Sequence, residues 1–247
     1  MNCFFDIFRC NSKKRFVIIS PSPINLIDLP ELVLETILEN LDFHSILILR
    51  RVCRSLRDFI DDIKPPSHLT TILIHVQSKL VSVELHFPSG PKSFNGYQTL
   101  YIDFHKTKNG CRLEYYKGMR YKVNRVKKFL ENEDFVKTAM NDLKVLMNHQ
   151  KTVLETFRLD IDYYNNTAND FDRNMEPIAQ EVLGGFKEIL EPRRSPIQLK
   201  NFQMTIVRQD QVAQILPFVD SKVLQKIGIR GKKEHPMDSF RIDELEK

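Results

Sequence analysis

The chain has 247 residues, a formal net charge of +5 and no tryptophan. Its length exceeds the usual size of one domain, so we expect one large domain or two smaller ones with a substantial core. Hydrophobic residues make up 42% and charged residues 28%, a composition that excludes disordered and fibrous proteins. No apolar run approaches the roughly 20 residues of a membrane helix, and the cysteines form no CxxC pair. We therefore expect a protein of the cytosol or nucleus, where thiols stay reduced.

Two proline-containing breaks, Ser20–Pro23 and Lys64–Ser67, bracket a short helical unit. We place this unit at residues 25–66, after an N-terminal extension of residues 1–24. Asp28-Leu-Pro-Glu31 marks the start of its first helix. Apolar residues at helical spacing then form one stripe, which consists of Leu29, Val33, Ile37 and Leu41. A unit this small cannot bury all of its apolar faces unaided, so a surplus face is expected to meet a partner.

Beyond residue 66 the apolar period changes from that of helices to that of strands. Segments 70–76, 80–87, 97–104 and 111–116 are rich in β-branched and aliphatic residues. Lys108-Asn-Gly110 is a favoured hairpin turn between the last two. These features predict four strands in meander order. Residues 122–150 then have apolar residues at helical spacing and predict one long helix or two short ones.

Three segments near the C-terminus share the pattern L-x-x-L-x-L, which is the strand signature of leucine-rich repeats. They are Leu154–Ile161, Leu199–Ile206 and Leu224–Ile229. The spacing is irregular, and alternating apolar residues also mark any half-buried strand. Helices are expected near 177–190 and 209–218, with Gly184-Gly185 kinking or dividing the first. Both interpretations give a mostly parallel sheet with helices on it. The expected fold class is therefore α+β: a three-helix unit, a β-meander, and an irregular leucine-rich-repeat-like strand and helix domain.

The sequence contains no catalytic or nucleotide-binding motif of the P-loop, dinucleotide, zinc-protease or serine-hydrolase type. Asp160 and Asp162 could hold a divalent cation, but such a pair more often flanks a buried strand residue. The strand histidines His75, His86 and His105 lack ligand spacing to any cysteine. We therefore expect no enzyme activity, no metal and no cofactor.

Positive charge is concentrated in residues 117–128, which contain no acidic residue. The basic residues there are Lys117, Arg120, Lys122, Arg125, Lys127 and Lys128. Such a cluster is one feature of nucleic-acid-binding surfaces. Only Tyr121 supplies an interleaved aromatic ring, and a charged run at the start of an amphipathic helix is usually a solvated face. Nucleic-acid binding is thus the alternative interpretation.

The helical unit resembles an F-box. The residues that carry the likeness are Leu29-Pro30, Val33-Leu34, Ile37-Leu38, Leu41-Asp42, Ser45 and Arg51-Val52-Cys53-Arg54. Glu131–Phe135, His149–Lys151 and Asp210–Asp220 are similar to the FTH half of nematode F-box proteins that also carry an FTH domain. Two residues depart from the pattern: Leu56 stands where many F-boxes place tryptophan, and Leu32 where an acidic residue is usual.

The resemblance implies a non-catalytic substrate adaptor. The F-box at 25–66 would dock on a Skp-type adaptor and through it on a cullin–RING ubiquitin ligase, while an FTH-like α/β domain at 67–247 would hold a target protein. Family members usually continue past residues 224–229, so this second domain is expected to be incomplete at its C-terminus. The residues expected to contact the adaptor are Leu29, Pro30, Val33, Ile37, Leu38, Leu41, Val52, Cys53 and Leu56.

A second hypothesis concerns the target-binding surface. In an L-x-x-L-x-L strand the apolar positions enter the core, and the intervening side chains face the other side of the sheet. That geometry selects Arg158, Asp160, Gln203, Thr205 and Arg230 for contact with a target. Ordinary exposed sheet residues remain the alternative.

Overall fold

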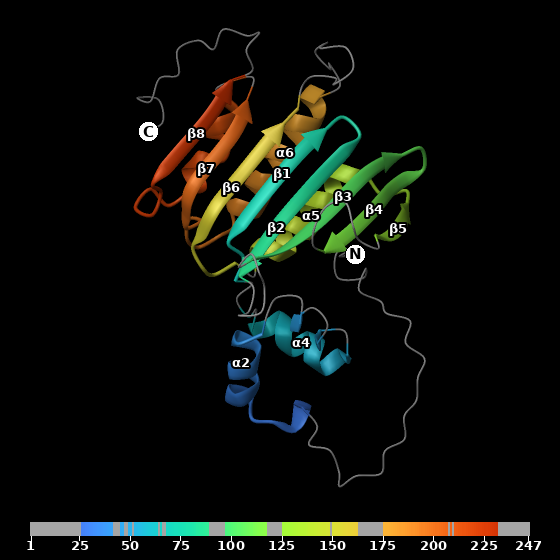
Figure 1. Cartoon of the computed structure of the whole chain (residues 1–247), viewed down its shortest axis with the longest axis vertical. Coiled ribbons are helices and arrows are strands. Elements are labelled where there is room, and N and C mark those ends of the chain that lie inside the picture. Colours follow the sequence, from blue (N-terminus) through green and yellow to red (C-terminus); the bar gives the residue numbers. More distant parts are fainter. Residues whose placement is uncertain are drawn as a thin grey trace.

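The chain forms a small helical unit and a large sheet covered by helices, as seen in a computed structural model (Figure 1). The described residues are 26–41, 45–46, 49–50, 52–63, 65, 68–88, 97–117, 125–148, 150–162, 175–206, 208 and 210–231. The predicted N-terminal extension, residues 1–24, lies outside them. The helical unit contains the 3-10 turn η1 (Leu26–Asp28), α2 (Glu31–Glu39) and α4 (Arg54–Ile63). None of the described helices is long and apolar enough to cross a membrane.

The core of the helical unit is small. Leu38, Ile46 and Ile60 are fully buried, and partly buried apolar side chains pack around them. Arg50 and Asp61 brace the unit, with Arg50 Nη2 donating to Asp61 Oδ2 at 2.7 Å. α2 buries Leu34 and Leu38, which lie one position after Val33 and Ile37 of the apolar stripe noted in the sequence. Five apolar residues crowd this short helix, so it has more than one apolar stripe and the fold buries only one of them.

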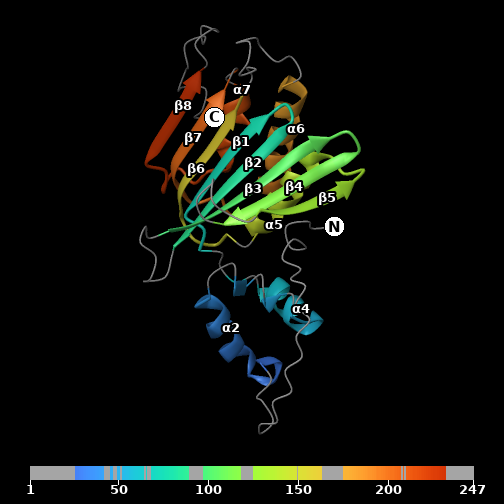
Figure 2. The same cartoon turned by 45° about the vertical axis from the view of Figure 1, so that its right-hand side comes forward.

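One sheet of eight strands forms the rest of the fold, in the order β5-β4-β3-β2-β1-β6-β7-β8 (Figures 1 and 2). The antiparallel part consists of β1 (Thr71–Gln77), β2 (Leu80–Pro88), β3 (Tyr97–Thr107), β4 (Gly110–Lys117) and β5 (Val126–Glu131). The parallel part consists of β6 (Leu154–Ile161), β7 (Leu199–Ile206) and β8 (Lys226–Gly231). β1 joins the two parts, since it pairs antiparallel with β2 and parallel with β6.

The predicted meander of four strands is confirmed, including the hairpin turn before Gly110. That glycine has φ +144°, and a Cβ there would lie 2.1 Å from the carbonyl oxygen of Leu130. A side chain is therefore excluded on two grounds, the backbone conformation and the close approach of β5.

The predicted helix over residues 122–150 is wrong in its first half. Val126–Glu131 forms β5, which pairs with β4 through partners such as Leu130 and Cys111. Only α5 (Phe135–Asn148) is helical. Asp134 starts α5, because its Oδ1 accepts hydrogen bonds from the backbone N–H groups of Val136 at 2.8 Å and Lys137 at 3.0 Å. Pairing with the edge of β4 thus overrides the helical spacing of the apolar residues in Val126–Glu131.

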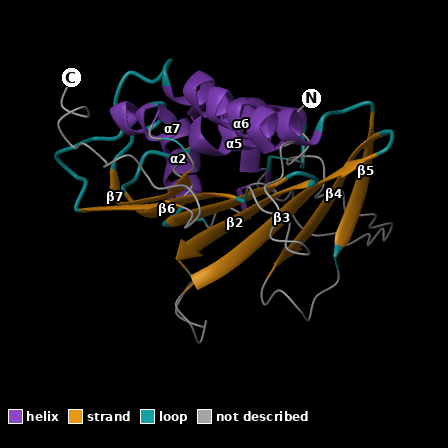
Figure 3. Cartoon of the chain, turned by 90° about the horizontal axis from the view of Figure 1, so that it is seen from above, coloured by secondary structure: helices purple, strands orange, loops and turns teal. Residues whose placement is uncertain are grey.

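Helices α5, α6 (Met175–Leu190) and α7 (Asp210–Ala213) lie on one face of the sheet (Figure 3). Alternate strand residues point to them and form the main core. Phe157 of β6, for example, packs edge-on against Phe186 of α6 at 5.5 Å between ring centroids and stacks with Phe202 of β7 at 6.0 Å. The second predicted helix, 209–218, is only α7 followed by the 3-10 turn η2 (Leu216–Phe218).

The expected break at Gly184-Gly185 is wrong, because α6 runs unbroken from Met175 to Leu190. Gly185 instead permits close packing on α5: a Cβ there would lie 2.8 Å from Met140 Cγ. A mixed α+β fold is therefore confirmed. The three-helix form of the first unit and the leucine-rich-repeat-like character of the second stay predictions, as do the domain boundaries.

Candidate functional site

The helical unit exposes several large apolar side chains. Among the described residues of this unit, Leu32 is 73% exposed, Val52 65%, Val33 42% and Ile27 38%. Leu32 and Val33 lie on α2, and Val52 lies in the turn before α4. α2 has a second apolar side that the fold leaves in water, because its Leu34 and Leu38 already fill the core. Apolar surface of this kind is a candidate binding site for another protein.

The structure separates the nine predicted adaptor contacts into three groups. Pro30, Val33 and Val52 are exposed, and Leu29, Ile37, Leu41 and Cys53 are partly exposed. Leu38 and Leu56 are 2% and 4% exposed and belong to the interior of the unit; contact of the nine residues with an adaptor stays a prediction. Cys53 also helps to begin α4, as the N–H of Leu56 donates to its sulfur at 3.5 Å. Leu32, the most exposed of these apolar residues, was not among the predicted contacts, although an apolar residue at a position that is usually acidic was a usable signal.

The face of the sheet opposite α5 and α6, here called the open face, is polar across its whole width. Residues paired across neighbouring strands point to the same side. One continuous row of such partners runs from β5 to β8, and we call it the polar row. Its members are Lys127, Glu114, Asp103, Ser82, His75, Asp160, Thr205 and Arg230. In the part of the chain that the structure describes, no helix covers this row.

Two carboxylates of the polar row are buried and well bonded. Asp103 accepts a hydrogen bond from Ser82 Oγ at 2.6 Å and one from the hydroxyl of Tyr116 at 3.5 Å. Tyr116 in turn stacks on Tyr101 at 4.8 Å. These contacts make the β2 to β4 part of the open face a rigid polar platform rather than a loose surface.

Glu114 is the second buried carboxylate and is 4% exposed. Arg112 Nε lies 3.2 Å from one of its oxygens, and Arg125 Nη1 lies 3.1 Å from the other. Lys127 Nζ is 3.5 Å away. Burial raises the pKa of Glu114, but the Arg125 hydrogen bond and the neighbouring cations outweigh it and hold this pKa below its usual value. Glu114 is therefore an ionised structural anchor.

His105 lies beside this cluster and stays neutral. Its pKa is lowered, chiefly by burial and then by the charge of Arg112, although Asp103 and Glu114 act in the opposite direction. Within the described residues its Nε2 is buried and has no hydrogen-bond partner. No nucleophile or metal-ligand set accompanies it there, since those residues hold no group of three or more histidines, cysteines and acids suited to a metal ion.

The predicted target-binding residues are brought together on the open face. Arg158 pairs with Gln203, Asp160 with Thr205, and Thr205 with Arg230, on the neighbouring strands β6, β7 and β8. Asp160 accepts a hydrogen bond from Thr205 Oγ1 at 2.7 Å and pairs with Arg158 Nε at 2.6 Å. The Asp160 carboxylate thus already has hydrogen-bond and ion-pair partners within the sheet. Whether this group of side chains contacts a target stays a prediction.

The basic stretch 117–128 is not the start of a helix. It spans the end of β4 and the start of β5, and Arg120 and Lys122 lie in the interval 118–124, outside the described residues. Arg125 and Lys127 form ion pairs with Glu114. Part of the positive charge that suggested nucleic acid is therefore neutralised by the sheet itself.

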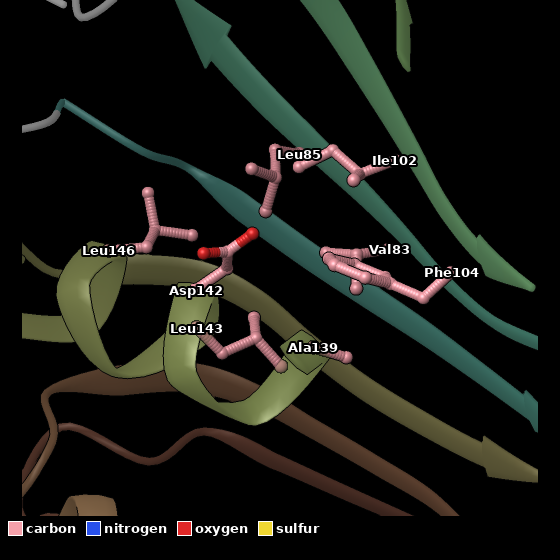
Figure 4. A pocket seen from close by; sticks show the side chains of 8 residues that line it. All are labelled: Val83, Leu85, Ile102, Phe104, Ala139, Asp142, Leu143 and Leu146. Atoms are coloured by element: carbon pink, nitrogen blue, oxygen red, sulfur yellow. The ribbon is translucent and has the colours of Figure 1, made fainter. Parts of the chain in front are cut away.

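A small pocket lies between α5 and strands β2 and β3 (Figure 4). Apolar side chains line it except for Asp142, whose carboxylate points into it (Figure 4). Its volume of about 10 Å³ is room for about one water molecule, so it cannot hold a substrate.

Comparison with known proteins supports the sequence resemblance. The F-box domain model matches residues 26–68, and the FTH domain model matches residues 180–247. F-box A protein 224 of Caenorhabditis elegans is 24% identical over 225 residues, which cover 91% of this chain and 50% of that protein. The chain therefore spans about half the length of this curated relative. No solved structure matches. The resemblance to nematode F-box proteins with an FTH domain is confirmed, and the FTH match begins within α6 and includes β7 and β8.

Proposed function

We propose that the chain is a non-catalytic substrate adaptor of a cullin–RING ubiquitin ligase. Its helical unit, residues 25–66, docks on a Skp-type adaptor, and the sheet unit, residues 67–247, holds a target protein. The observation that carries this proposal is the exposed apolar surface of α2 and the turn before α4, which lies in the segment that matches the F-box model. Cys53 and Cys111, the cysteines of the described residues, form no disulfide bond, which suits the cytosol or nucleus, where such an assembly would act.

The physical basis of docking is the burial of this surface. The core of the helical unit uses Leu34 and Leu38 from α2, while Leu32 and Val33 stay 73% and 42% exposed. Full burial of such a side chain is worth roughly 1.5–3 kcal/mol, so a partner would recover most of this at Leu32 and less than half of it at Val33. An exposed apolar side of a short helix fits an apolar groove on another protein.

Replacement of Val33 and Val52 by aspartate tests the docking. The double variant Val33→Asp plus Val52→Asp should lose at least about tenfold in affinity for a Skp-type adaptor, since it places two charges in the contact. Co-purification and calorimetry would measure the loss, and circular dichroism would verify the fold.

Val126→Asp is the control of matched exposure and charge for the single variant Val33→Asp. Val126 is 46% exposed, close to the 42% of Val33, but it lies on the edge strand β5. It should leave adaptor binding unchanged. If the double variant binds normally while folded, or if the control weakens binding equally, the proposed docking surface is wrong.

The target-binding surface of this proposal is the β6 to β8 part of the open face. Arg158 is 38% exposed on this surface, and Arg230 is exposed on the edge strand. Arg158→Glu plus Arg230→Glu should reduce recovery of a target in affinity purification with mass spectrometry. Lys137→Glu plus Lys144→Glu on exposed positions of α5 changes the net charge equally and should not. Equal recovery from all three proteins would exclude this face.

A further inference from the structure

A groove lies at the end of the sheet where β6 and β7 begin, next to the helical unit. It lies between the end of α5 and the turn that follows α6, with a volume of about 520 Å³. We call it the basal groove. Its lining residues are Asn148, Gln150, Lys151, Thr152, Arg193, Arg194, Ser195, Pro196, Ile197 and Gln198. This volume is in the range of ligand-binding clefts, about 300–1,000 Å³.

The basal groove is positively charged. Lys151, Arg193 and Arg194 line it, and no acidic side chain is present among its described lining residues. Lys151 Nζ donates to the carbonyl oxygen of Ile63 at 3.0 Å, an acceptor with no net charge. Within the described residues none of the three cations has a carboxylate partner. The open face differs, because there Arg158, Arg125 and Lys127 all pair with acids.

The walls of the groove are fixed before any ligand binds. Arg193 Nη1 donates to the carbonyl oxygen of Met147 at 2.7 Å, which ties the α6 turn to the end of α5. Gln150 Nε2 donates to the carbonyl oxygens of Leu69 at 3.1 Å and Thr152 at 2.8 Å. The N–H of Leu154 donates to the carbonyl oxygen of Gln198 at 2.9 Å. A ligand would therefore lose little binding free energy to ordering of the protein.

Arg193, in the wall of the groove, has a hydrogen-bond donor without an acceptor. Its Nε is buried and has no hydrogen-bond partner within the described residues. Burial lowers the pKa of its guanidinium, because desolvation disfavours the charged form. An anion bound in the groove would place negative charge near the Arg193 guanidinium and so offset the free-energy cost of its desolvation.

We propose that the basal groove binds an acidic, carboxylate-rich peptide segment of the target protein. The charge of the lining selects an anion. Asn148, Thr152 and Gln198 supply amide and hydroxyl groups that can hydrogen-bond a peptide backbone. The contact of Lys151 with Ile63 places the bound segment beside α4. The inference rests on the proposed function and specifies the chemistry of the target.

The test measures fluorescence anisotropy of a labelled octaglutamate peptide with the full chain at roughly 0.1 M salt, where the Debye length is about 10 Å. An octaglutamine peptide should not bind. Lys151→Gln plus Arg194→Gln should weaken octaglutamate binding roughly tenfold, since two exposed ion pairs together contribute at most about 2 kcal/mol and about 1.4 kcal/mol corresponds to tenfold. Citrate should compete only far more weakly than the peptide.

Lys79→Gln plus Lys108→Gln is the matched control. Both residues are exposed in hairpin turns at the end of the sheet away from the groove, and the change in net charge is identical. Binding should change less than about twofold. Equal losses in both double variants, no binding by the parent, or citrate binding as tightly as the peptide would overturn the proposal. Co-purification with a Skp-type adaptor, measured on the same proteins, separates this failure from a failure of the proposed function.

Discussion

At the residue scale, Glu114 shows how a charge can lie in a sheet and still stabilise it. The carboxylate is 4% exposed, whereas its partners Arg112, Arg125 and Lys127 are 45%, 44% and 61% exposed. The three cations stay about half exposed to water while they satisfy the buried anion. The desolvation cost thus falls mainly on one group, and several charge-assisted hydrogen bonds offset it.

We predict that Glu114→Gln lowers the free energy of unfolding by about 2 kcal/mol at pH 7, since hydrogen bonds to charged groups contribute about 1.5–3 kcal/mol. Urea denaturation followed by circular dichroism measures the change. Glu155→Gln is the control, because the Glu155 side chain is 49% exposed and pairs with Lys200 at the surface. That substitution should cost less than about 1 kcal/mol. An equal loss in the two variants would contradict the anchoring role of Glu114.

The lowered pKa of Glu114 also predicts the pH dependence of this difference. A carboxyl whose pKa is lower in the folded state binds fewer protons there than in the unfolded state. Its contribution is complete above the unfolded value of about 4.3 and is lost as the pH falls through the folded value. The stability gap between the parent and Glu114→Gln should therefore be constant from pH 7 to about 5 and shrink below about pH 4. A gap that widens on acidification would be inconsistent with this sign.

At the scale of elements, the packing of α5 on α6 depends on one of two adjacent glycines. A Cβ at Gly184 would meet no atom within 4 Å, whereas one at Gly185 would lie 2.8 Å from Met140 Cγ. The two positions have the same helical context and differ only in their neighbours. A comparison of alanine substitutions at the two positions therefore distinguishes the effect of helix propensity from the effect of packing between α5 and α6.

Gly184→Ala should stabilise the protein by about 0.5–1 kcal/mol, because alanine has the higher helix propensity. Gly185→Ala should be less stable than Gly184→Ala by about 1–3 kcal/mol, since Met140 has to move from a filled core. Thermal unfolding of the two single variants tests this order. Equal stabilisation by both alanines would mean that α6 does not lie against α5 as described.

The sequence predicted the types of most elements and the meander of the first four strands, but not the pairing of β5 with β4 or of β6 with β1. The strand segments and the helix at 177–190 have clear periodicity, and the structure places β1 to β4, β6, β7 and α6 at those positions. Val126–Glu131 was misassigned because its apolar residues at 126, 129 and 130 fit a helix, while the edge of β4 decides its conformation. The buried stripe of α2 was equally ambiguous, since Leu32, Val33 and Leu34 are adjacent apolar residues and only tertiary packing selects Leu34.

Of the candidate sites, the residues on strands could be predicted from the sequence and the basal groove could not. Alternation along the strands was enough to place Arg158, Asp160 and Thr205 on one face, because neighbouring strands keep their register. The basal groove could not be predicted, since its lining comes from the segments after α5 and α6, which are separated by about 40 residues of sequence and meet through Arg193. Loop residues without periodicity carry no signal of such proximity.

At the scale of the whole molecule, the two units have very unequal cores. The helical unit is built around Leu38, Ile46 and Ile60, whereas the sheet unit has one continuous core that extends from β4 to α7. The described polar contacts between the units include the Lys151–Ile63 hydrogen bond and one from His68 to the carbonyl oxygen of Glu39 at 3.0 Å. Small cores give marginal stability, so the helical unit should open more easily than the sheet.

Leu38→Ala tests this inequality, because Leu38 is 2% exposed in the smaller core and such a truncation costs about 2–5 kcal/mol. That loss is comparable to the whole stability expected of a unit this small. Hydrogen exchange with mass spectrometry should show lost protection in α2 and α4 and unchanged protection in β6 and β7. Phe202→Ala is the reciprocal control, since Phe202 is fully buried in the larger core and should lower protection across the sheet. If Leu38→Ala lowered protection equally in both units, they would form one cooperative domain, and a Skp-type adaptor would then stabilise the sheet as much as the helices.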